Sequence, residues 1–142
     1  MNGLKSVGKR EVTKLVTRLA KQPRAQCDVL VCPPATLLAT LSEAVEGSRV
    51  AIGGQDCHAN EAGPHTGDVS AAMLMDLGCA YVIVGHSERR ADHKESNKMV
   101  RAKAEAAHKA GLRAIVCVGE TAVERKRGKT LEVVGKQLTV SL

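Results

Sequence analysis

Aromatic side chains are almost absent from this sequence of 142 residues, which has no Phe, no Trp and Tyr81 as its single Tyr. A stacking platform for nucleic-acid bases needs several exposed rings, so this kind of interface is excluded. The formal net charge of +6 would otherwise favour a nucleic-acid partner. The basic residues are scattered, however, and only Arg125-Lys126-Arg127 form a compact cluster. We expect no nucleic-acid partner and a core of aliphatic residues.

Long hydrophobic runs and paired cysteines are missing as well. No apolar stretch approaches the length that crosses a bilayer, and the first five residues contain no apolar segment typical of a signal peptide. The five cysteines are an odd number and contain no Cys-x-x-Cys pair. We therefore expect no membrane partner, free thiols and a cytoplasmic location.

Four short apolar runs alternate with helical patterns along the chain. The runs lie at residues 28–32, 50–54, 80–84 and 114–118, and none shows period-two alternation, which is typical of strands buried on both faces. Helical patterns lie at residues 12–19, 37–45, 71–77, 98–109, 121–124 and 130–142. This order predicts a single α/β domain over residues 1–142, with about four parallel strands and flanking helices. Its two unpaired sheet edges favour self-association.

A polar cluster follows the third apolar run directly. Gly85 permits a tight turn, and His86, Ser87 and Glu88 come next, where a new helix is expected to begin. Ligands and catalytic groups gather at this end of parallel strands, so a functional site is favoured over an ordinary polar turn. A serine hydrolase is excluded because Arg89 occupies the last glycine position of the Gly-x-Ser-x-Gly elbow.

Two further patterns have simpler interpretations. Cys57 and His58, together with His65, match no standard zinc spacing, so we expect loop residues and neither a metal nor a cofactor. Three methionines are expected to be packing residues: Met73, Met75 and Met99.

Several segments resemble one enzyme family. The run Val-Gly-His-Ser-Glu-Arg-Arg at residues 84–90 resembles the signature of triosephosphate isomerase. Residues 32–37, 52–58, 66–78 and 114–120 also resemble segments of that family, so the resemblance covers essentially the whole chain. It implies a partial (β/α)8 TIM barrel that contains strands two to five of the eight.

The resemblance also implies catalytic roles in the interconversion of glyceraldehyde 3-phosphate and dihydroxyacetone phosphate. His86 matches the histidine that, in this well-described family, polarises the substrate carbonyl as a neutral imidazole. Glu88 matches an active-site carboxylate, Ser87 a supporting neighbour and Cys117 a buried cysteine near the site. A small phosphorylated triose is the implied, weakly bound ligand.

A second set of residues matches the dimer contact of the family. Thr66 and Gly67, with His65 beside them, match the loop tip that enters the partner subunit. Asp56 departs from the family's usual amide at a position that contributes to the dimer interface. The implied partner is a second copy of this chain, in a dimer or a larger homo-oligomer.

Important parts of the family's catalytic set have no match among these 142 residues. They are the catalytic glutamate, the substrate-steering lysine, the closing lid and the backbone groups that hold the phosphate. We therefore expect weak or no isomerase activity, with a self-associating, non-catalytic half-barrel as the alternative. A third hypothesis is an active enzyme rebuilt from two or more half-barrels. It is disfavoured because closure adds strands but no base, and Glu43 or Glu120 would act as base only by accident of geometry.

Overall fold

The computed structural model describes residues 2–22 and 27–142. Its helices and strands alternate as the sequence predicts, and a helix does begin directly after His86. In order, the elements are α1 (Lys5–Ala20), β1 (Val29–Val31), the 3-10 helix η1 (Ala35–Leu37), α2 (Leu38–Val45), β2 (Val50–Gly54), α3 (Ala71–Asp76), β3 (Tyr81–Val84), α4 (Ser87–Asp92), α5 (Asn97–Lys109), β4 (Arg113–Val116), α6 (Ala122–Lys126) and α7 (Thr130–Ser141).

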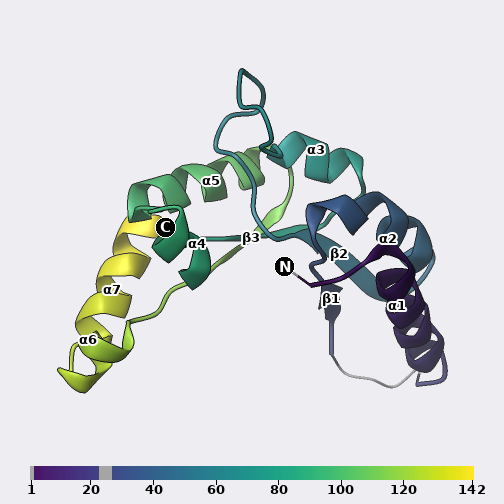
Figure 1. Cartoon of the computed structure of the whole chain (residues 1–142), viewed down its shortest axis with the longest axis horizontal. Helices are drawn as coiled ribbons and strands as arrows, with labels where there is room; N and C mark the ends of the chain where they lie inside the picture. Colours follow the sequence, from purple (N-terminus) through teal and green to yellow (C-terminus); the bar gives the residue numbers. More distant parts are fainter. Residues whose placement is uncertain (1, 23–26) are drawn as a thin grey trace.

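The four strands form one parallel sheet in the order β1-β2-β3-β4. Each strand therefore neighbours the next one along the chain, and this confirms the predicted α/β architecture. Figure 1 shows α1 and α2 beside β1 and β2, whereas α4 to α7 lie toward the other end of the sheet. The segment between β2 and α3 extends away from the rest of the chain (Figure 1).

The core lies between one face of the sheet and the helices. Val82 and Val84 of β3 are completely buried, and Val100 of α5 is buried with them. Leu41 of α2 and Leu74 of α3 extend this cluster toward β2. These aliphatic side chains provide nearly all of the buried apolar surface, because the chain has almost no aromatic rings.

The prediction that all strands are buried on both faces is wrong. In β4 the residues alternate between exposed and half-buried, and Ile115 is 38% exposed. Strand pairing sets Leu30 beside Ala51 and Ile83 beside Ile115. With Tyr81 and Arg113, these residues form what we term the open face of the sheet. Among the described residues, the helices pack against the opposite face. The sequence does not reveal this difference, because both faces of the strands are apolar.

The three methionines expected to pack lie outside the buried core: Met73, Met75 and Met99 are 57%, 47% and 46% exposed. The capping box predicted at Thr121 and Glu124 is confirmed: each side chain binds the backbone N–H of the other residue. Within residues 2–22 and 27–142, every helix is too short or too polar to cross a membrane.

Candidate functional site

The turn after β3 places the predicted cluster at the carboxyl end of the sheet. Gly85 has a φ of +69°, in the region that favours glycine. A Cβ at this position would lie 2.8 Å from both Val100 methyl carbons, so the turn also needs the missing side chain. His86 follows as the N-cap of α4.

One backbone hydrogen bond to His86 favours a particular tautomer of the neutral ring. Its Nδ1 accepts a hydrogen bond from the backbone N–H of Glu88 at 3.3 Å, which puts the proton of the neutral ring on Nε2. The Glu88 carboxylate lies 3.7 Å from the same Nδ1, and its side chain is 83% exposed. Ser87 is exposed and makes no side-chain hydrogen bond with the residues that the structure describes. The structure thus brings His86 and Glu88 together and leaves Ser87 in solvent.

Arg90 holds the site to both neighbouring strands. Its guanidinium donates to the carbonyl of Gly85 at 2.7 Å and to the carbonyl of Cys117 at 3.1 Å. A third bond, at 2.6 Å, goes to the side chain of Asn97 at the start of α5. Burial lowers the pKa of Arg90, and the planar fork still supplies all three bonds. The carboxyl ends of β3 and β4 are therefore fastened together through one side chain.

Arg89, on the other side of α4, joins an ion network. It contacts Asp56 at 2.9 Å and Glu95 at 2.7 Å, and Lys103 binds both of these carboxylates. Burial raises the pKa of Asp56 despite the two cations. Burial also acts to raise the pKa of Glu95, but hydrogen bonds from Lys103 and Arg89 outweigh it and the pKa is lowered.

A cleft of about 930 Å³ opens beside His86. Its far wall is the segment after β4, which includes Gly119 and Glu120. The amide of Gln137 on α7 binds both backbone polar groups of Gly119, at 2.7 and 3.0 Å. Glu120 accepts a bond from Thr130 at 3.1 Å and is 13% exposed. The cleft therefore combines an imidazole donor with a carboxylate from the neighbouring strand end.

The remaining residues near the cleft include some that the sequence analysis named and two that it did not. Burial raises the pKa of Cys117, which also lines the cleft. Glu43 lies on α2, away from the cleft-lining residues. Sequence reasoning missed Arg90 and Gln137 as organising residues, because neither motif nor spacing reveals partners that lie 27 and 18 positions away.

The predicted partner loop lies apart from this cleft. Thr66 and Gly67 are exposed at a turn in which the N–H of Asp68 binds the carbonyl of His65 at 3.0 Å. Gly67 has a φ of +93°, as the third residue of a type II turn requires. His65 is half-buried and stacks on His58, with ring centroids 4.0 Å apart. Of the residues that the structure describes, these two histidines and Asp68 form the group whose side chains could hold a metal ion.

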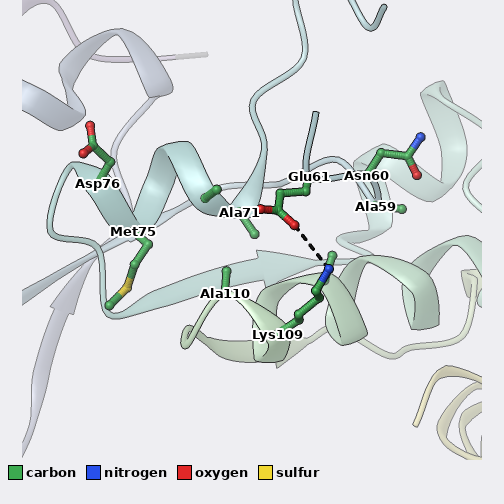
Figure 2. Close-up of a pocket in the computed structure, with 10 residues that line it drawn as sticks. Ala59, Asn60, Glu61, Ala71, Met75, Asp76, Lys109 and Ala110 are labelled. Carbon is green, nitrogen blue, oxygen red and sulfur yellow. Dashed lines mark hydrogen bonds and ion pairs between the residues drawn. The ribbon is translucent and has the colours of Figure 1, made fainter. Parts of the chain in front are cut away.

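A smaller cavity, of about 370 Å³, lies between the same loop, α3 and α5. Figure 2 shows Met75 and Asp76 at one side and the Glu61–Lys109 ion pair across the other. The two charged atoms of that pair are 3.2 Å apart. Alanine side chains make up most of the remaining lining, and the cavity shares no lining residue with the His86 cleft.

Comparisons with known proteins agree with the sequence resemblance. A family model described as triosephosphate isomerase matches residues 1–142. Triosephosphate isomerases of Afipia carboxidovorans and Brucella suis are 57% and 51% identical to the chain, over 143 and 142 residues. Each match covers 100% of this chain and 56% of the relative, so the chain spans about half the length of these curated relatives.

A solved structure shows the same relationship in three dimensions. The crystal structure of triosephosphate isomerase from Bartonella henselae matches with a TM-score of 0.88 and 44% sequence identity. It covers 100% of this chain, which corresponds to 58% of that protein. The four parallel strands and their helices therefore match part of an isomerase structure.

Proposed function

The chain belongs to the triosephosphate isomerase family, and from this premise we propose that its 142 residues form an isomerase half-barrel with little or no turnover of its own. In the family reaction, glyceraldehyde 3-phosphate and dihydroxyacetone phosphate interconvert. A neutral histidine polarises the carbonyl while a base moves a proton between carbons.

The tautomer of His86 carries this proposal. The Glu88 N–H occupies Nδ1 and leaves the Nε2–H of the imidazole to donate to a carbonyl oxygen in the cleft. The chain thus keeps the electrophile, and a small phosphorylated triose is its proposed weak ligand. No residue among the 142 matches the family's base, and Glu120 in the same cleft is already bonded to Thr130. Without a base in reach of the carbon acid, the proton transfer lacks its main catalyst.

An isomerase assay of the purified chain tests this proposal. We expect turnover no higher than that of the His86→Ala variant, assayed at the same concentrations. Turnover that the substitution abolishes contradicts inactivity. If that turnover also rises steeply with protein concentration, it favours a site rebuilt from two or more half-barrels.

A second proposed property is self-association, which the open face supports. Ile115 is 38% exposed there, on an edge strand whose outer backbone groups have no strand beside them in the described chain. A second copy could cover this apolar surface and pair with that edge. The loop with His65, Thr66 and Gly67 is the proposed second contact. The proposed assembly is a homodimer or larger homo-oligomer of one partial-barrel domain.

Sedimentation velocity measures this property directly. We expect a mass of at least two chains, and a shift toward the monomer in the Ile115→Lys variant. The matched control is Val123→Lys, at an exposed position of α6 outside the open face, which should leave the mass unchanged. A well-folded monomer for the unmodified chain contradicts self-association.

The proposed location is the cytoplasm, whose reducing conditions suit five free thiols.

A further inference from the structure

The loop between β2 and α3 is closed at its base by backbone pairing. The N–H of His58 binds the carbonyl of Val69 at 2.8 Å, and His58 forms an isolated bridge with Ser70. This pairing brings the two ends of the loop together. His58 at its start and Asp68 at its end therefore become neighbours, and the turn at residues 65–68 folds His65 back onto them.

Three potential metal ligands meet at this point. His58, His65 and Asp68 each offer one ligand atom, and these atoms all lie within 4.8 Å of one another. The Nε2 of His58 is 3.8 Å from a carboxylate oxygen of Asp68, and the two imidazole rings are inclined by 29°. Ligand atoms around a tetrahedral zinc ion lie about 3.3 Å apart. The present spacing is wider, so binding requires the two imidazole rings to rotate out of their stacked arrangement and bring their ligand nitrogens closer together.

We propose that His58, His65 and Asp68 bind a divalent transition-metal ion of the zinc class, with water in the remaining position. Two imidazole nitrogens and one carboxylate suit this class of ion. In the single chain the side chains of His58 and Asp68 are 26% and 54% exposed, so an ion can enter from solvent before a second copy covers the loop. The nearby guanidinium of Arg89 does not oppose the ion as a lone charge, because Asp56 and Glu95 neutralise it.

The sequence also suggested Cys57 as a candidate ligand, but in the structure its side chain lies outside the group of His58, His65 and Asp68. Its side chain is 1% exposed, and its Sγ lies 3.7 Å from the carbonyl of Lys103. Burial raises the pKa of this thiol to about 11, which disfavours the thiolate that metals bind. The third member of the group is therefore Asp68 and not Cys57. The spacing of His58, His65 and Asp68 also matches no standard zinc pattern.

Asn60 supports both rings and supplies a signature of metal binding. Its backbone N–H donates to Nδ1 of His58 at 3.0 Å, and its side-chain amide nitrogen lies 2.9 Å from Nε2 of His65. A metal on Nε2 of His58 needs the ring proton on Nδ1, because a neutral imidazole has one N–H. The Asn60 N–H must then leave Nδ1, so metal binding should shift its amide resonance.

Cobalt titration of the chain, prepared without a histidine tag, tests the proposal. We expect one Co²⁺ per chain with visible absorption bands typical of four-coordinate cobalt, loss of those bands when Zn²⁺ is added, and a shift of the Asn60 amide. His65→Ala and Asp68→Asn should each weaken binding at least tenfold. The matched control is His108→Ala, an exposed histidine of α5 that lies outside the group, and it should bind as the unmodified chain does.

Two results overturn the proposal. One is the absence of any cobalt or zinc binding to the unmodified chain at neutral pH. The other is binding that His65→Ala and Asp68→Asn leave unchanged, which would place the ion elsewhere. Circular dichroism of both variants without metal shows whether they are folded. Should His65→Ala unfold the loop, Asp68→Asn keeps the test decisive, because it retains the size of the side chain and removes its charge.

Discussion

Lys103 of α5 and Glu95 form a buried ion pair, with Nζ 2.6 Å from Oε1 and side chains that are 8% and 1% exposed. Lys103 also binds both carboxylate oxygens of Asp56, at 2.8 and 2.9 Å. The second oxygen of Glu95 is buried and finds no hydrogen-bond partner in the described part of the chain. The network joins the segment after β2 to α4 and α5, and so fastens the helix that His86 caps.

Removing the cation of this network should destabilise the fold strongly. Lys103→Met leaves Arg89 as the only cation, within the described part of the chain, that contacts Glu95 and Asp56. We therefore expect a loss of about 3–5 kcal/mol in the free energy of unfolding. Urea denaturation measures the change. The matched control is Lys109→Met, which breaks the exposed pair with Glu61 and should cost about 0–1 kcal/mol. Similar losses in the two variants would show that the buried network contributes little.

Glu95 and Asp56 should affect acid stability in opposite directions. The folded pKa of Glu95 lies below its ordinary value of 4.5, so its stabilising contribution is present above pH 4.5 and is lost as pH falls through the folded pKa. Glu95→Gln should therefore flatten the acid limb of stability against pH. Burial raises the folded pKa of Asp56 above 3.8, and its contribution is lost as pH rises through that pKa. Asp56→Asn should steepen the same limb.

Urea denaturation between pH 3 and pH 6 checks these slopes. Each variant is compared with the unmodified chain in the same buffers. Acid limbs that run parallel in all three proteins would contradict both pKa shifts. A flatter limb in Asp56→Asn would contradict the direction for Asp56 alone.

The sequence predicted the elements better than the surfaces between them. β2 matches its predicted range, and the capping box at Thr121 is present, because both depend on residues close together in the chain. The site at His86 was found for the same reason, since its strand, turn and helix start are consecutive. The exposure of Ile115 depends instead on which layers cover the sheet, and an apolar strand does not encode that information.

Contacts between distant segments were also beyond the sequence. Arg90 was part of a recognised run, but its bond to the carbonyl of Cys117 depends on how β3 and β4 pair. Asp68 joined the two histidines only because the base of its loop is closed by His58. Local patterns thus located the candidate residues, whereas tertiary packing decided which of them meet.

Two glycines near the cleft should respond oppositely to a methyl group. Gly85→Ala forces an alanine into a positive φ and brings its Cβ to 2.8 Å from Val100. We expect a loss of about 2–5 kcal/mol, from backbone strain and overpacking together. At Gly119 no atom lies within 4 Å of the added Cβ, so Gly119→Ala should be neutral or stabilise by up to about 1 kcal/mol. Urea denaturation of both variants measures the difference, and equal losses would contradict the requirement for glycine at Gly85.

The side chain of Gln137 should slow amide hydrogen exchange at Gly119 in the wall of the cleft. Its Oε1 accepts the N–H of Gly119 at 2.7 Å, across 18 residues of sequence. Gln137→Ala removes this bond and the 3.0 Å bond that the side-chain amide donates to the Gly119 carbonyl. The bond to the Gly119 N–H contributes about 1 kcal/mol net, so we expect that amide to exchange with deuterium about fivefold faster. The control is Lys136→Ala, an exposed neighbour on α7 that should leave this rate unchanged. An unchanged rate in Gln137→Ala would mean that α7 does not order the wall of the cleft that faces His86.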